Sequence, residues 1–274
     1  MNLHQSQLAT WSPVTLTDAK QHCRIDIEDD DALINGQLAA AVVRGEQATN
    51  RQFAPATWVL KLDAFPGTDT FELPKPPLLS VSSIQYVDTD GATQTFSSSD
   101  YSVDRTSEPG RVVLGFGNSW PSARAQPDAI TITYLAGYGS VVTAVNATNV
   151  FTIAAGGRTY ADNMQVRLFS VGGDVPAGLT ADTAYFIRDA SGSTFKLALT
   201  AGGTAISISS DGTGTIYIDE VPEIIKAAIK LEAAQLYENR ESYLADVQGA
   251  TPVTNPTSEN IYRQLHIHTT EWGY

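Results

Sequence analysis

The chain has 274 residues, enough for one large domain or two ordinary ones, and its 42% hydrophobic and 17% charged residues are typical of a globular protein. Its formal net charge of −13 excludes a protein that grips DNA through a basic surface, because such binding neutralises phosphates with Lys and Arg. We expect neither a membrane span, which needs roughly 20 apolar residues in a row, nor a signal peptide, and the single cysteine, Cys23, cannot form an internal disulfide.

Two helices are predicted near the N-terminus. The first begins at Thr15 or Thr17, either of which can cap it, and ends near Arg24. The acidic run at residues 26–31 then leads into the second helix, because carboxylates offset the positive end of the helix dipole. If this helix continues to about Arg51, it spans roughly 30 Å. Its expected buried stripe follows helical spacing and consists of Ile34, Leu38, Ala41, Val42 and Gly45.

A strand-rich stretch follows the second helix. Alternating apolar and polar residues predict strands at residues 58–62, 83–87 and 130–134. The segment at residues 88–91 contains the Asp and Gly residues of a turn. Prolines at residues 74–77 force an extended connection before the second of these strands.

The composition changes between Gly139 and Asp219. Residues 141–218 carry four basic and five acidic side chains, so that −12 of the net charge of −13 lies elsewhere. Short apolar runs separated by Gly, Asp and Ser turns follow one another at the spacing of a small sandwich or barrel. We therefore predict a separate all-β domain at residues 140–218, inserted into a loop of the flanking domain. Its expected strands are residues 150–153, 166–169, 185–187, 195–199, 206–208 and 215–218.

Another helix and a tail are expected at the C-terminal end. Pro222 can be the first residue of a helix, where its missing N–H has no cost. The tail at residues 246–274 is rich in Thr, Pro and Asn up to Ile261, and residues 261–268 then alternate like a strand without an internal partner. The apolar side of the predicted helix consists of Ile224, Ile225, Ala228, Ile229, Leu236 and Tyr237, with Lys226, Lys230, Glu232 and Glu238 elsewhere.

Together these elements predict an α+β fold. A helical core with a small β-sheet and loop region occupies residues 1–139 and 219–245. The all-β domain at residues 140–218 interrupts it, and an extended tail for partner docking occupies residues 246–274.

Motifs of catalysis or metal binding are incomplete in this sequence. His266 and His268 place two rings on one side of a strand, whereas a zinc site needs three or four ligands. The acidic run at residues 26–31 lacks the Gly and the terminal Glu of a calcium loop. The glycine pairs at residues 115–117 and 137–139 lack the full nucleotide-binding patterns. We therefore expect no catalytic residue, no cofactor and no metal, and the chain is predicted not to be an enzyme.

Short segments on both sides of the predicted β-domain, taken in their order along the chain, are similar to those of a known protein family. Residues 14–139 and 219–244 resemble the head-tail connector (adaptor) family of long-tailed bacteriophages. In that family the helix that begins with Val-Pro follows soon after the Gly-Tyr-Gly segment, whereas here about eighty residues intervene. The inserted region is similar to small β modules of phage virion proteins at residues 181–186 and 193–197. The segments that carry the connector resemblance are residues 14–20, 29–34, 51–53, 57–58, 73–81, 86–91, 100–104, 120–121, 132–139, 221–222 and 236–241.

The resemblance implies a structural protein of the virion neck. Such proteins form a ring, commonly of twelve copies, beneath the portal, extend the DNA channel and link the capsid to the tail. The expected partners are further copies of the chain, the portal protein and a downstream neck or tail-completion protein. The acidity of the chain agrees with a channel that DNA crosses without specific binding, because a negative wall repels phosphates.

Two surfaces are hypothesised to carry these contacts. The tail would pair with the portal or a neighbouring subunit by strand addition, the alternative being that it packs on its own domain. The two longer helices would supply the subunit core and possible ring contacts. The docking residues are Tyr262, Leu265, Ile267 and Trp272, and the core and ring residues are Ile34, Leu38, Val42, Ile225, Ile229 and Leu236.

One alternative function remains open at this point. The chain could be another neck, tail-completion or decoration protein whose β-domain binds a virion partner or a host surface glycan. Glycan binding favours exposed aromatic rings, and alternation places most of the aromatic residues of the β-domain in its core. These residues are Tyr160, Tyr185, Phe186 and Tyr217.

Overall fold

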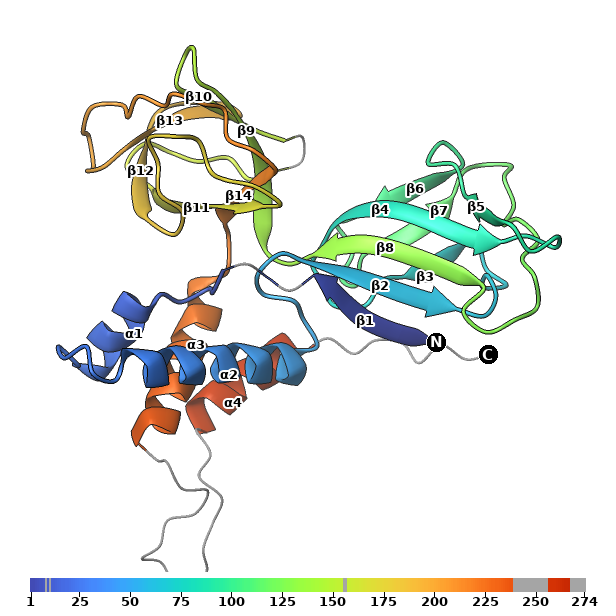
Figure 1. The fold of residues 1–274 in the computed structure, drawn as a ribbon, viewed down its shortest axis with the longest axis horizontal. Coiled ribbons are helices and arrows are strands. Elements are labelled where there is room, and N and C mark those ends of the chain that lie inside the picture. Colours follow the sequence, from blue (N-terminus) through green and yellow to red (C-terminus); the bar gives the residue numbers. More distant parts are fainter. Residues whose placement is uncertain (8, 10, 155–156, 239–255, 267–274) are drawn as a thin grey trace, which may run out of the picture. The chain divides into compact units, whose positions relative to one another are not determined.

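The computed structural model describes residues 1–7, 9, 11–154, 157–238 and 256–266 (Figure 1). The chain divides into two compact units, one formed by Met1–Gly137 with Pro222–Tyr274 and the other by Tyr138–Val221. Over the described residues there are four helices and three antiparallel sheets, so the predicted α+β class is confirmed. That residues 140–218 fold independently stays a prediction.

The helices of the first unit begin and end at recognisable signals. At the start of the first helix, the Thr15 hydroxyl accepts from the Asp18 amide at 3.0 Å, and the Asp18 carboxylate accepts from the Thr15 amide at 3.4 Å. Arg24 ends this helix in the left-handed conformation, as predicted. The second helix stops two residues before the expected Arg51. The helices are α1 (Leu16–Cys23), α2 (Asp31–Thr49), α3 (Glu223–Glu238) and α4 (Pro256–Leu265).

The helix α3 packs against the other three helices. Most of the predicted core positions are buried, whereas Val42 and Leu236 are half-buried. Ile224 was expected on the buried side but is 48% exposed, because it is turned about 100° around the helix from Ile225. Glu232, expected on the polar side, is buried. The fully buried core positions are Ile34, Leu38 and Ala41 of α2 and Ile225, Ala228 and Ile229 of α3.

The β part of the first unit is larger than the small sheet and loop region that was predicted. Its strands form a five-stranded sheet of order β1-β2-β8-β4-β5 and a three-stranded sheet of order β3-β7-β6. Both sheets contribute to one hydrophobic core, in which Phe65 stacks on Trp120 with ring centroids 5.0 Å apart. The three strands predicted here are confirmed as parts of β2, β4 and β8. The strands are β1 (Asn2–Gln7), β2 (Ala56–Leu62), β3 (Thr70–Glu72), β4 (Leu78–Val87), β5 (Thr93–Thr95), β6 (Tyr101–Asp104), β7 (Arg111–Leu114) and β8 (Ile130–Ala136).

The second unit is a closed ring of six antiparallel strands, in the order β10-β13-β12-β11-β14-β9 with β9 pairing back to β10. We call this unit the strand ring. Residues 206–208 do not form the expected strand, although Ile208 is buried and its amide donates to the Asn149 side chain at 2.9 Å. The strands are β9 (Gly139–Val145), β10 (Val150–Ile153), β11 (Gln165–Val171), β12 (Ala184–Ser191), β13 (Thr194–Ala198) and β14 (Thr215–Asp219).

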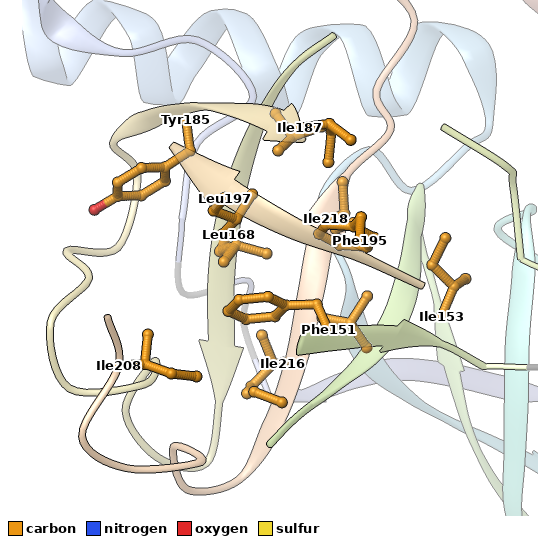
Figure 2. Packing of buried hydrophobic residues seen from close by; sticks show 13 residues of the cluster. Phe151, Ile153, Leu168, Tyr185, Ile187, Phe195, Leu197, Ile208, Ile216 and Ile218 are labelled. Atoms are coloured by element: carbon orange, nitrogen blue, oxygen red, sulfur yellow. The ribbon is translucent and has the colours of Figure 1, made fainter. Parts of the chain in front are cut away.

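Apolar side chains fill the interior of the strand ring (Figure 2). Phe151 and Phe195 stack there with ring centroids 5.6 Å apart. Alternate residues of each strand point inward, as the period of two in a strand requires. This core is separate from the core of the two sheets in the first unit.

Candidate docking and assembly surfaces

The C-terminal segment that was predicted as an extended docking strand is the helix α4. The prediction was wrong because the apolar residues Ile261, Tyr262 and Leu265 fit the spacing of a helix as well as they fit the alternation of a short strand. Pro256 also begins a helix favourably, since its missing N–H would have no partner there.

Tyr262 holds α4 on the second helix. Its side chain is 2% exposed, and its ring lies over Gly45 of α2. A Cβ added at Gly45 would lie 3.1 Å from the Tyr262 ring and 2.8 Å from the Phe53 ring. Glycine at this position therefore lets two aromatic rings pack directly on the helix backbone. Of the other predicted docking residues, Leu265 is half-buried, and Ile267 and Trp272 lie outside the described residues.

A buried carboxylate joins three helices. The Glu232 side chain of α3 is 1% exposed and accepts from Arg44 of α2 at 2.5 Å and from the Ser258 hydroxyl of α4 at 2.7 Å. Arg44 also forms an ion pair with Glu259 of α4 at 3.3 Å. A charge removed from water in this way is stable only while its partners remain in place. The helices α2, α3 and α4 are therefore fixed to one another by this network.

The end of α4 is fixed by further hydrogen bonds. Arg51 donates from Nε to the Leu265 carbonyl at 2.9 Å and forms an ion pair with Glu108 at 2.7 Å. His266 Nδ1 lies 2.8 Å from the Ala48 carbonyl. A shallow cavity of about 400 Å³ remains between α2 and α4, lined by Arg44, Ala48, Glu259, Tyr262, Arg263 and His266.

A half-buried carboxylate joins α2 to the sheets. Glu46 accepts from the Gln52 side chain at 2.7 Å and from the Phe53 amide at 2.9 Å, and the Gln52 side chain in turn accepts from the Trp58 indole at 3.1 Å. Burial raises the pKa of Glu46 to about 7, even though the backbone amides of Phe53 and Ala54 and the charge of nearby Lys75 act in the opposite direction. The role of Glu46 could not be predicted from the sequence, because a lone Glu on an amphipathic helix is ordinarily solvated.

In the acidic run at residues 26–31, some carboxylates form contacts within the subunit and others are exposed to solvent. Asp30 accepts from the Tyr237 hydroxyl at 2.6 Å, and Asp31 pairs with Lys20 at 2.7 Å. Asp30 is the N-cap residue of α2 but makes no side-chain hydrogen bond that caps the helix. Asp26, Glu28 and Asp29 are exposed.

Within the described residues, no group of three or more His, Cys, Asp and Glu side chains is arranged to hold a metal ion. The partner suggested for His266 as a metal ligand, His268, lies outside the described residues. Among the described helices, none combines the length and the apolar character that a membrane span requires.

Comparison with known proteins gives a family match within the first unit. Residues 13–108 match the family described as phage gp6-like head-tail connector protein. Over these residues the chain is similar to this family. The matched segment contains α1, α2 and the strands β2 to β6, and the family is one of structural connector proteins and not of enzymes.

Solved structures with a similar fold come from gene transfer agent (GTA) particles. A chain from the virion of the native GTA particle is 14% identical at a TM-score of 0.57, over 100% of this chain and 99% of that chain. A chain from the neck of the empty GTA particle, computed with C6 symmetry, has the same values. One from the neck of the native particle, computed with C12 symmetry, has a TM-score of 0.55 at 14% identity and the same coverage. At this identity the likeness concerns the fold. No curated protein matches the chain.

Proposed function

We propose that the chain is the head-tail connector of a virion neck, where its copies form a ring between the portal and the tail. The observation that carries the proposal is the family match at residues 13–108. It is supported by the likeness in fold, along the whole chain, to chains from GTA necks computed with C6 and C12 symmetry. We propose twelve copies per ring, which is the common number in the connector family that the chain resembles. Such a ring would continue the channel of the portal above it.

The charge distribution supports a channel function. Residues 141–218 have a net charge of −1, so the strongly acidic part of the chain is the connector part. Repeated around a ring, this charge would repel DNA phosphates and leave the duplex free to slide. Sequence-independent DNA binding would require basic side chains to neutralise phosphates. We propose that exposed carboxylates such as Asp26, Glu28 and Asp29 contribute to this repulsion.

The strand ring is proposed to be an inserted all-β domain of the barrel type. Its closed order of six strands and its separate apolar core support this assignment. Tyr185 and Tyr217 are each 3% exposed, and the Tyr160 hydroxyl donates to Glu220 at 2.5 Å. The rings of Tyr160 and Tyr185 belong to the core of the strand ring, and Tyr217 is buried outside that core, which favours a structural role over glycan binding.

The proposal is tested by removing the gene for the chain and imaging the particles that form. We expect heads without attached tails, and complementation with the intact gene should restore joined particles. Purified chain mixed with its portal should form a ring visible by electron microscopy, with a mass that gives the copy number. Normal joined particles without the chain would overturn the proposal.

A further inference from the structure

One side of α2 is apolar although it faces solvent. The exposed positions from Ala32 to Val43 carry no charged side chain, and Leu33 and Val43 are 38% and 51% exposed. The opposite side of the helix is buried in its own unit, as described above. A helix that is apolar on both sides is ordinarily covered on both sides. Within the residues that the structure describes, the outer side of α2 is therefore the side that lacks a cover.

Gly36 lies at the centre of this outer side, and no contact within the described chain requires glycine there. A Cβ added at Gly36 would meet nothing within 4 Å, whereas one added at Gly45 on the inner side would meet two aromatic rings. Glycine in a helix interior is less favourable than alanine. No described neighbour of Gly36 requires glycine at this position. Its small size would instead let a helix of another molecule approach α2 closely.

The outer residues of α2 follow the spacing of a helix-helix seam. Residues 33, 36, 40 and 43 are separated by three, four and three positions, the pattern that keeps a continuous row on one side of a helix. We call this row the α2 outer row; it consists of Leu33, Gly36, Ala40 and Val43.

The helix α3 carries a second row with the same spacing. Ile224 is 48% exposed, and the other three members are half-buried. Large and small side chains alternate in this row. Ile224 and Leu231 are about 10 Å apart along the helix and Gly36 and Ala40 about 6 Å apart, so one large member could enter the space above Gly36 and Ala40. We call it the α3 outer row; it consists of Ile224, Ala227, Leu231 and Ala234.

We infer that the α2 outer row of one copy packs on the α3 outer row of the next copy in the ring. This inference rests on the proposed function and names the surfaces that would build the ring. A ring with rotational symmetry uses two different surfaces on every subunit, one for each neighbour. The two rows are different, apolar and on separate helices, which is what such a contact requires. Occupants other than a second copy, such as the portal protein, are distinguished by the tests below.

The first test uses substitutions that leave the subunit fold intact. Gly36→Leu fills the space above α2 and Ile224→Glu places a charge in the α3 outer row, so each should weaken ring formation about tenfold or more. Gly67→Leu and Leu199→Glu are matched controls, because a Cβ at Gly67 also meets nothing within 4 Å and Leu199 is 67% exposed. Ring formation is followed by native mass spectrometry, and folding by circular dichroism. Unchanged rings in both row variants would overturn the inference.

The second test identifies the partner by cysteine cross-linking. In a Cys23→Ser background, one preparation carries a cysteine at residue 36, 40 or 43, and the other carries one at residue 227 or 234. An added oxidant such as diamide takes two electrons and two protons from a pair of adjacent thiols and leaves a disulfide. We expect a covalent dimer in mixtures of the two preparations and monomers in either preparation alone.

The other outcomes separate the inference from the proposed function. Dimers of one preparation alone would show that a row pairs with itself, and a cross-link only to the portal would assign the row to that protein. Either result overturns the inference while the ring remains. If the chain with all its native residues forms no ring alone or with the portal, the proposed function fails, and the inference fails with it.

Discussion

The two sides of α2 differ in what covers them. The inner side is buried in its own unit, and near the end of the helix Arg44, Gly45 and Glu46 are all committed to contacts within the unit. Arg44 forms an ion pair, Gly45 leaves room for two aromatic rings, and Glu46 makes a hydrogen-bonded link to the sheets. On the outer side, residues 33–43 present apolar and small side chains to solvent. One helix can therefore stabilise its own subunit through one side and leave the other side available for a contact with a neighbouring subunit.

The largest effect is expected from breaking the charged network on the inner side. Arg44→Ala leaves the Glu232 carboxylate, which is 1% exposed, without its charged partner, which should cost about 3–5 kcal/mol of unfolding free energy. Urea denaturation measures this loss. Glu259→Ala is the matched control, because its side chain is 38% exposed and such pairs contribute at most about 1 kcal/mol. Equal losses in the two variants would show that the buried position of Glu232 is unimportant.

The next largest loss of stability is expected at Gly45, where the absence of a Cβ leaves room for two aromatic rings. Gly45→Ala places a Cβ 2.8 Å from the Phe53 ring, so the two aromatic rings must move, at a cost of about 1–3 kcal/mol. Thermal unfolding should show a lower Tm. An unchanged or higher Tm would mean that Tyr262 does not rest on this part of α2.

The pH dependence of stability should reveal the link between α2 and the sheets. The pKa of Glu46 is raised from its ordinary 4.5 to about 7, so the folded chain holds the proton more tightly than the unfolded chain. Stability from this group is therefore full below about pH 4.5 and falls as the pH rises toward 7. Glu46→Gln should remove a fall on the order of 1 kcal/mol, measured as the difference in unfolding free energy between pH 5 and pH 8. A parallel pH profile in both proteins would contradict the assignment.

The smallest effect is expected on the outer side and has the opposite sign. Gly36→Ala should stabilise the isolated subunit by about 0.5–1 kcal/mol, because alanine is the better helix former and its Cβ meets open space. The same variant should form rings less readily than the unsubstituted chain. Denaturation of the subunit and native mass spectrometry of the ring measure the two quantities separately. A destabilised subunit would show that this side is covered from within.

Periodicity revealed the long elements and failed at the short and the ambiguous ones. The helix α2 and the strands β2, β4 and β8 were predictable because each repeats its pattern over seven or more residues. Strands β3 and β5 have three residues each, too few for alternation to be recognised. Strand β9 lies at the junction of the two units, where the Gly-Tyr-Gly segment indicated a turn instead.

The candidate surfaces were less predictable than the fold, because they depend on contacts between distant parts of the chain. Glu232 was expected in solvent since it is charged, and only the approach of Arg44 and Ser258 makes its burial possible. Tyr262 was assigned to partner docking, whereas it packs on a glycine more than two hundred positions away in the sequence. The α2 outer row was visible as a run of small and apolar residues, but its exposure follows only from the packing of α3 and α4 on the other side.

A reconstruction of the virion neck that resolves individual helices tests the central claim most directly. We expect a ring of copies of this chain between the portal and the tail, with α2 of each copy beside α3 of the next. Finding the chain elsewhere in the particle would contradict the connector function. Finding the ring with both helix rows exposed to solvent would contradict the proposed contact between its subunits.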